Sequence, residues 1–228
     1  MPAPPSASRI DSVPFGRRVL LAGASGLVGG ELLRGLLADD TVATVHVLAR
    51  RPLASTHPKL QARIVDFAAL PPLPALDEAY LALGTTIKLA GSQAAFRAVD
   101  FDANLAVARA AHDAGARRLG LASAMGADAA SRVFYNRVKG ELEEAVRRIG
   151  FEAVVIARPS LLLGDRGALG QPVRTGEHVG SLLAGVLRPL IPARYRPIEA
   201  RDVARALLAE VPRARGVLVL PSDVMQAA

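Results

Sequence analysis

Residues 17–30, RRVLLAGASGLVGG, combine a short apolar run with a turn that contains three evenly spaced glycines. Val19–Ala22 is apolar enough to form a buried parallel strand, and the residues after Gly30 have the apolar spacing of a helix. A strand, a glycine-rich turn and a helix in this order predict a site for the phosphates of a dinucleotide. The alternative is an ordinary strand-to-helix loop that happens to be rich in glycine.

Each glycine of this turn has an expected role. Gly23 lets the chain turn sharply off the strand, Gly26 lets the backbone approach a pyrophosphate, and Gly29 lets the helix pack closely on the sheet. The positive end of the helix dipole would face the phosphates. The residues expected to contact the cofactor here are Gly23, Ser25, Gly26, Leu27 and Val28. Their spacing is Gly-x-x-Gly-x-x-Gly, which differs from the Gly-x-Gly-x-x-Gly of many dehydrogenases.

The composition limits what the chain can be. Its 228 residues, 51% of them hydrophobic, suffice for one sizeable core. The net charge of +7 comes from scattered arginines, and only 4% of residues are aromatic, so no nucleic-acid surface is indicated. The absence of cysteine excludes disulfides and thiol nucleophiles, and the four histidines lack the spacing of a metal site.

The N-terminal segment and the length of the apolar stretches predict where in the cell the protein is found. Residues 1–16 are rich in proline and serine and are expected to form a flexible tail, without the apolar core of a signal peptide. No apolar stretch approaches the length needed to span a bilayer. We therefore expect a soluble cytoplasmic protein that binds a small-molecule substrate and contacts neither membrane nor nucleic acid.

Strands and helices are expected to alternate along the chain, which predicts an α/β fold with a doubly wound parallel sheet. The expected strands are Val19–Ala22, Thr44–Ala49, Ala62–Val65, Glu78–Leu83, Arg118–Ala122, Glu152–Ala157 and Gly216–Leu220. The expected helices are 31–37, 92–114, 131–149, 179–187 and 201–210, and the last residues are expected to form a tail.

One domain is expected over 17–228, with residues 164–200 as a small substrate lobe rich in glycine, proline and arginine. The oligomeric state stays open at this point. The long helices at 92–114 and 131–149 could pair across a two-fold axis, but their alanine-rich faces would also pack within a monomer.

The ends of the early strands predict which dinucleotide binds. Arg50 and Arg51 follow the second strand, where an acidic residue would bind the ribose of NAD and arginines suit the 2′-phosphate of NADP. A pair of solvated arginines is the alternative. Asp66 and Phe67 end the third strand, where the adenine would lie. Gly84, Thr85 and Thr86 follow the fourth strand, with chemistry that suits either the cofactor or a plain turn.

Tyr135 and Lys139 are four residues apart on one expected helix, so their side chains share a face. Ser123 follows the fifth strand, so all three could converge at the carboxyl edge of the sheet, beside a bound nicotinamide. A phenol is a poor acid–base at neutral pH, and the Lys139 ammonium would favour its ionised form. Tyr-x-x-x-Lys alone is common on helices; in this position it predicts Tyr135, Lys139 and Ser123 as catalytic residues.

With these residues the chain resembles the short-chain dehydrogenase/reductase superfamily, in its extended and atypical branches. The glycine turn and the Tyr135–Lys139 pair carry the resemblance, which covers about residues 17–210. Other segments are similar to the HIV Tat-interactive-protein-like group of small NAD(P)H-binding proteins: Leu83–Thr86, Val99–Asp100, Gly126–Asp128, Lys139–Glu141 and Arg158–Ser160. The resemblance implies a Rossmann-type fold, bound NADP(H), Tyr135 as proton donor or acceptor, and Lys139 on the nicotinamide ribose. It adds Leu83, Gly84, Thr85 and Pro159 to the cofactor site.

Two positions depart from the pattern of the superfamily. Ala124 stands where related proteins have a second serine, and Asp100 stands where the extended branch has asparagine. The expected function is an NADP-dependent oxidoreductase acting on a carbonyl or alcohol. An NADPH-binding regulator with little turnover is the alternative, and a nucleotide-sugar epimerase or dehydratase ranks last because the lobe is small.

Overall fold

The computed structural model describes residues 16–163 and 192–226. Its strands are β1 (Arg17–Ala22), β2 (Val42–Ala49), β3 (Leu60–Ile64), β4 (Glu78–Leu81), β5 (Arg118–Ala122), β6 (Ala153–Arg158), β7 (Leu162–Leu163), β8 (Ile198–Glu199) and β9 (Gly216–Pro221). Its α-helices are α1 (Leu27–Ala38), α2 (Ile87–Ala90), α3 (Gln93–Arg97), α4 (Asn104–Asp113), α5 (Phe134–Arg147), α7 (Ala200–Glu210) and α8 (Ser222–Gln226). A π-helix, η1 (Ala98–Ala103), joins α3 to α4, and η3 (Ala193–Tyr195) is a 3₁₀ turn.

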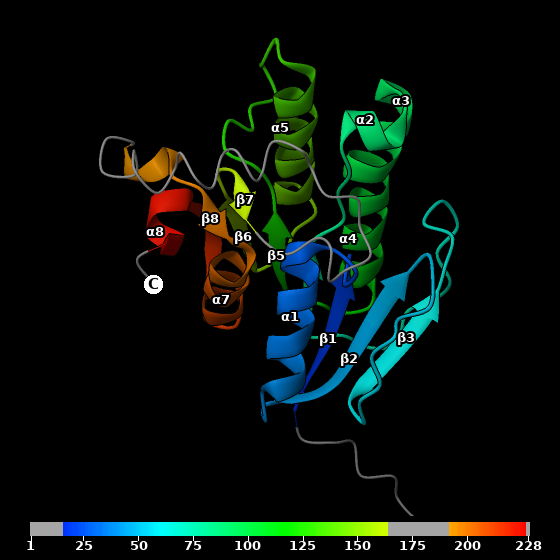
Figure 1. Ribbon diagram of the computed structural model, residues 1–228. Helices are drawn as coiled ribbons and strands as arrows, with labels where there is room; N and C mark the ends of the chain where they lie inside the picture. The colour runs from blue at the N-terminus through cyan, green and yellow to red at the C-terminus, as the bar shows by residue number, and fades with distance from the viewer. Residues whose placement is uncertain (1–15, 164–191, 227–228) are drawn as a thin grey trace, which may run out of the picture.

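A seven-stranded sheet in the order β3-β2-β1-β4-β5-β6-β9 forms the centre of the molecule (Figure 1). Every pairing in it is parallel, which confirms the predicted doubly wound Rossmann-type sheet. The strand order reverses between β1 and β4, and ligands of such sheets bind outside the carboxyl ends of the strands at this point. The glycine turn after β1 lies there.

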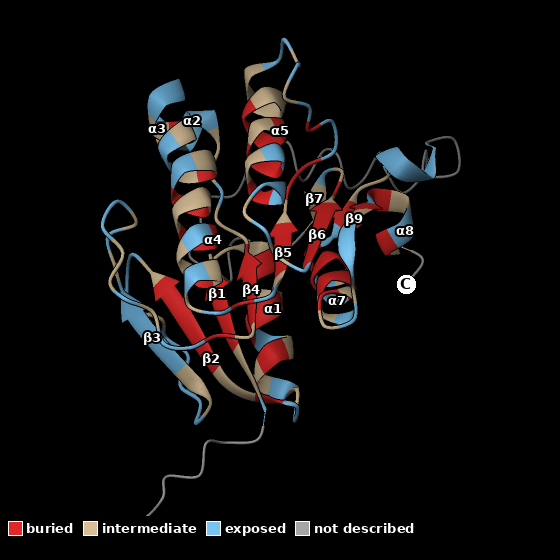
Figure 2. Ribbon diagram, turned by 180° about the vertical axis from the view of Figure 1, so that it is seen from behind, coloured by how far each residue is buried: buried red, intermediate tan, exposed pale blue. Residues whose placement is uncertain are grey.

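The two faces of the sheet are covered by different helices, because alternate strand residues point to opposite sides. Val19 and Leu21 join one buried cluster with α1 and α7. Leu20 and Ala22 join the other cluster, which holds α4 and α5. Figure 2 shows the inner strands buried between these layers. Burial on both faces explains why these strands are continuously apolar in sequence.

The structure differs from the sequence prediction at three places. The helix expected at 92–114 is divided by the π-helix η1. The two-stranded sheet of β7 and β8 was not predicted. The expected C-terminal tail is wrong as far as residue 226, since α8 buries Met225 completely. Its Ser222 hydroxyl donates to Ser160 at 2.9 Å, so α8 is tied to the residues after β6.

Parts of the sequence prediction lie outside the described residues: the N-terminal tail up to residue 15, the helix at 179–187, and the substrate lobe from 164 to 191. None of the helices in the described ranges is long and apolar enough to cross a membrane.

Candidate active site

The glycine at position 23 is required by the protein itself. Gly23 has φ +95°, a conformation that side chains disfavour. A Cβ there would lie 2.4 Å from the backbone of Ala82, just after β4. The turn closes with a hydrogen bond from the Gly26 N–H to the Gly23 carbonyl, 2.9 Å long. Gly23 thus brings the end of β1 against the end of β4.

The space around the backbone differs between Gly29 and Gly26. A Cβ on Gly29 would lie 1.9 Å from the Gly23 carbonyl oxygen, so α1 packs directly on the turn only because Gly29 lacks one. A Cβ on Gly26 would meet its nearest protein atom at 3.4 Å, and its φ of −86° suits any residue. The described protein atoms leave room for a side chain at position 26. A glycine there is explained if a ligand approaches the backbone closely at this position.

The N-terminus of α1 is open to a phosphate. Gly26 is the N-cap and supplies no side-chain cap, and no acidic residue occupies the first turn. The first N–H groups of a helix lack intrahelical partners, so those of Leu27 and Val28 can bind an anion. Ser25 is exposed in the same turn. The charge and geometry of this turn are compatible with a dinucleotide phosphate, and the contacts of these residues with it stay a prediction.

The residues that end β2 and β3 lie on the same edge. Arg50 and Arg51 are exposed, and neither forms an ion pair with a residue in the described ranges. Asp66 is exposed, and its Oδ1 accepts from the Ala68 N–H at 2.9 Å, so this carboxylate holds a turn. Phe67 is half-buried against the core. The two guanidinium groups are therefore free to meet an anion beside the glycine turn.

The chain after β4 is fastened to the π-helix. The Thr85 N–H donates to Asp100 Oδ2 at 2.8 Å, and the Leu83 carbonyl accepts from Asn104 Nδ2 at 3.1 Å. Gly84 lies exposed between them. Asp100 and Asn104 are completely buried. The loop predicted to touch the cofactor is thus held by two polar side chains that the structure buries.

Lys139 forms an ion pair with Asp100, with 2.7 Å between Nζ and Oδ1. Both side chains are almost fully buried, at 5% and 1% exposure. A Cβ on Gly84 would lie 3.6 Å from Asp100 Oδ1 and 3.9 Å from Lys139 Nζ. The pair therefore lies directly beside the exposed Gly84 backbone. Asp100 was noted from sequence only as a departure from the superfamily, and its contact with Lys139 could not be predicted.

Tyr135 lies one helical turn before Lys139 on α5 and is half-buried. Its ring packs on Phe96 of α3, with 5.6 Å between centroids. Phe96 also contacts Phe134 at 5.7 Å. Among the described residues the Tyr135 hydroxyl has no hydrogen-bond partner. The ring is held by packing, and the hydroxyl is left available.

The π-helix explains how Asp100 and Phe96 both reach α5. A π-turn adds a residue to the helical repeat and so changes which residues share a face. Asn104 Nδ2 donates to the carbonyls of Val99 and Asp100, both at 3.2 Å, within this widened turn. Such turns are frequent at functional sites. The composition of 92–114 suggested a regular helix and carried no signal of the π-turn.

Ser123 is bonded to a residue that the sequence did not identify. Its hydroxyl donates to Glu143 Oε1 at 2.6 Å, and Glu143 is 1% exposed. Arg158 donates to Glu143 through Nη2 at 2.6 Å and Nε at 3.0 Å. The hydrogen bonds to Glu143 raise the pKa of Arg158 above its usual value, so Arg158 keeps its charge. Glu143 is four residues after Lys139, a spacing that could have indicated it.

The loop after β5 is pressed against α5. A Cβ on Gly140 would lie 2.1 Å from the Ala129 nitrogen, so glycine lets this loop reach the helix. The Met125 N–H donates to the carbonyl of buried Pro159 at 2.8 Å. These contacts join the ends of β5 and β6 to the helix that carries Tyr135 and Lys139.

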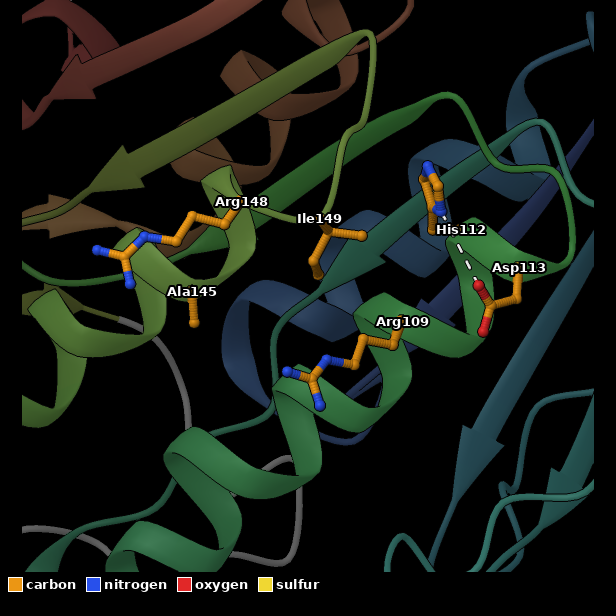
Figure 3. A pocket seen from close by; sticks show the side chains of 6 residues that line it. All are labelled: Arg109, His112, Asp113, Ala145, Arg148 and Ile149. Atoms are coloured by element: carbon orange, nitrogen blue, oxygen red, sulfur yellow. Dashed lines mark ion pairs between the residues drawn. The ribbon is translucent and has the colours of Figure 1, made fainter.

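A shallow pocket of about 290 Å³ lies elsewhere, between the C-terminal ends of α4 and α5 (Figure 3). It is lined by Arg109, His112, Asp113, Ala145, Arg148 and Ile149. The helices of a parallel α/β fold run opposite to the strands, so this pocket lies at the edge of the sheet away from Gly23. None of the predicted site residues lines it. In the described residues no three His, Asp or Glu side chains gather as a metal site would require.

Comparisons with known proteins identify relatives. No family model matches the chain. It is 36% identical over 181 residues to the mitochondrial protein fmp52 of Emericella nidulans, covering 74% of this chain and 75% of the relative. It is 31% identical over 205 residues to mitochondrial FMP52 of Candida albicans, covering 82% and 85%. These names state no activity. They contradict the cytoplasmic location expected from sequence, because the relatives are named mitochondrial proteins.

Among solved structures, MoeE5 in complex with UDP-glucose and NAD superposes with a TM-score of 0.67 at 20% identity. The match covers 89% of this chain and 75% of MoeE5. At this identity the likeness shows the fold alone, a Rossmann-type parallel sheet covered by helices on both faces.

Proposed function

This chain belongs to the Fmp52 family, and we propose that it is an NADP(H)-dependent oxidoreductase acting on a carbonyl or alcohol. The proposal rests on the position of α5, whose Lys139 reaches the edge of the sheet where the cofactor would bind. Lys139 Nζ lies 3.9 Å from a Cβ built on Gly84, in the loop after β4, and β4 pairs with the strand that leads into the glycine turn. A dinucleotide on that turn would extend towards this loop. We also propose that the chain belongs with the HIV Tat-interactive-protein-like group, as the sequence motifs suggest.

Tyr135 is the proposed acid–base. Its hydroxyl is available, and its ring is fixed against Phe96, so a proton donor would be held in one place. The cofactor supplies or accepts the hydride when it is bound. Lys139 would hold the nicotinamide ribose, while Tyr135 gives its proton to the oxygen of a carbonyl or takes one from an alcohol.

Ser123 is the weakest member of the constellation. Because its one hydrogen is donated to Glu143, it can donate to a substrate oxygen only if the hydroxyl turns.

The substrate itself is proposed to be a small, largely apolar molecule. Apolar side chains are exposed where β5, α5 and β6 reach the same edge: Met125 at 37%, Val133 at 58% and Leu161 at 51%.

The cofactor is proposed to be NADP(H), on the basis of Arg50 and Arg51. Titrations of NADPH and NADH against the wild type, Arg50→Ala and Arg51→Ala test this. We expect the wild type to prefer NADPH and the variants to lose that preference while still binding NADH. Arg34→Ala, which removes an exposed arginine from α1, is the matched control. If neither dinucleotide bound, the glycine turn would be only a turn and the oxidoreductase proposal would fail.

A regulator that binds NADPH with little turnover is the second candidate. The engagement of Ser123 by Glu143 and of Lys139 by Asp100 favours it, since both side chains already have partners. Tight NADPH binding without oxidation by any of a broad panel of carbonyls would support it.

An epimerase or dehydratase is the third candidate. MoeE5 with its UDP-glucose supports it through the fold alone, and binding of a uridine nucleotide would move it forward.

A further inference from the structure

The Asp100 carboxylate contacts two separate segments of the candidate site. Its Oδ1 lies 2.7 Å from Lys139 Nζ, and its Oδ2 accepts the Thr85 N–H at 2.8 Å. Lys139 belongs to α5, whereas Thr85 belongs to the loop after β4. One carboxylate therefore fixes the separation of two segments that the proposed function assigns to the cofactor site.

Asp100 is itself held in place by its surroundings. Its side chain and that of Asn104 are completely buried. Asn104 Nδ2 donates to the Asp100 carbonyl at 3.2 Å and to the Leu83 carbonyl at 3.1 Å. The loop after β4 is thus bonded at two points to residues of the π-helix region. Asp100 contacts Lys139 from a backbone that packing and hydrogen bonds already fix.

Lys139 needs a counter-charge to keep its place. Its side chain is 5% exposed, and an ammonium buried without a partner is costly. Glu141 and Glu143, on the same helix, are paired with arginines. Within residues 16–163 and 192–226, Asp100 is the only carboxylate paired with Lys139. An ammonium has three N–H groups, so this ion pair still leaves donors for a ligand.

We propose that Asp100 is a positioning residue that prepares the nicotinamide end of the cofactor site by holding Lys139 and the loop after β4 at a fixed separation. This inference rests on the proposed function and deepens it. In that function Lys139 donates to the nicotinamide ribose, and the backbone of Gly84 lies beside the ion pair. A site that is already ordered binds more tightly, because the ligand does not have to order it.

The test compares two ligands by calorimetric titration: NADPH, and adenosine 2′,5′-bisphosphate, which lacks the nicotinamide half. Asp100→Asn keeps an oxygen that accepts the Thr85 N–H but loses the charge that holds Lys139. It should raise the Kd for NADPH by about tenfold or more. The Kd for the adenosine fragment should stay unchanged, because that fragment has no group that reaches Lys139. Asp102→Asn, at an exposed carboxylate of the same π-helix, is the matched control and should change neither Kd.

The two ligands separate positioning from a general structural role. An equal loss of affinity for both ligands would show that Asp100→Asn disturbs the whole site, and would overturn the proposal. An unchanged Kd for NADPH would overturn it too, because the site would then be ordered without the charge of Asp100. Both results leave the proposed function intact. A wild type that binds neither ligand would refute the proposed function itself.

A second comparison does not depend on the folding of Asp100→Asn alone. The double variant Asp100→Asn/Lys139→Met removes both charges and leaves no unpaired buried charge. Because Asp100 acts through Lys139, the double variant and Lys139→Met should bind NADPH with the same Kd. A Kd about tenfold higher in the double variant than in Lys139→Met would show that Asp100 acts independently of Lys139, and would overturn the proposal.

Discussion

The Ser123 hydroxyl donates to Glu143 Oε1 at 2.6 Å, which ties the end of β5 to the second half of α5. Arg158, at the end of β6, binds the same carboxylate at 2.6 Å. Three elements therefore meet at one buried anion. The serine predicted to hold a substrate has a structural partner, and this separates its expected behaviour from that of Tyr135.

Ser123→Ala should lower stability and change turnover little. Glu143 loses one donor but keeps Arg158, so the free energy of unfolding should fall by about 1 kcal/mol. Turnover should fall less than about tenfold, because the Ser123 hydroxyl donates its hydrogen to Glu143. Denaturant unfolding and steady-state rates on one protein preparation measure both. A loss of about a hundredfold or more would instead make Ser123 a substrate contact.

Tyr135→Phe should remove turnover and preserve cofactor binding. General acid catalysis by a positioned side chain contributes about 10²- to 10⁴-fold, and kcat should fall by this factor. The ring still packs on Phe96, so the melting temperature and the Kd for NADPH should stay close to those of the wild type. Unchanged turnover on a verified substrate would eliminate Tyr135 as the proton donor.

Alanine at Gly29 should lower stability, whereas alanine at Gly26 should weaken cofactor binding. Gly29→Ala brings a Cβ to 1.9 Å from the Gly23 carbonyl and should destabilise the fold. Gly26→Ala meets only ordinary contacts in the protein, so it should fold normally and bind NADPH poorly. Gly30→Ala, whose Cβ would lie 3.6 Å from the nearest atom, is the matched control and should change neither property by much. Thermal unfolding and NADPH titration distinguish the three. Normal binding by Gly26→Ala would place the pyrophosphate elsewhere.

His46 should make stability depend on pH below neutrality. Burial lowers the pKa of His46, and the positive charges of Arg63 and Arg18 lower it further. As the pH falls below about 6.5, the unfolded chain binds a proton that the folded chain does not, so stability decreases. The slope is at most about 1.4 kcal/mol per pH unit and ends where folded His46 also protonates. Denaturant unfolding of wild type and His46→Gln between pH 5 and 8 should show this slope only in the wild type. An equal slope in both proteins would assign it to another group.

The C-terminal helix should matter for stability. Met225 is completely buried, so Met225→Ala should cost about 2–5 kcal/mol through lost burial and a cavity. Val224 beside it is 52% exposed, and Val224→Ala should cost little. Comparing the urea midpoints of the two variants measures this difference in stability. Similar midpoints would mean that α8 contributes little to the folded core.

The local parts of this fold could be predicted from sequence, because they depend on local signals. Strands β1, β2, β4, β5 and β6 follow apolar segments, and the glycine turn follows from its spacing, whereas β3 is mostly exposed and begins two residues before the expected Ala62. The ion pair of Asp100 with Lys139 joins residues 39 positions apart and depends on a π-turn that no composition signals. Helix α8 was missed because it has only five residues, most of them polar, and it is held by tertiary contacts such as the burial of Met225 and the Ser222–Ser160 hydrogen bond.

The π-helix also makes the length of this region more critical than its composition. Each residue of an α-helix turns the chain by about 100°, so losing one residue between Asp100 and Asn104 would rotate one end against the other by about that angle. Asp100 would turn away from Lys139, and Phe96 would turn away from Tyr135. Deletion of one exposed residue, Asp102, should therefore harm the site far more than its replacement by asparagine. The contacts of Asp100 with Lys139 and of Phe96 with Tyr135 therefore depend more on the number of residues in this helix than on their identity.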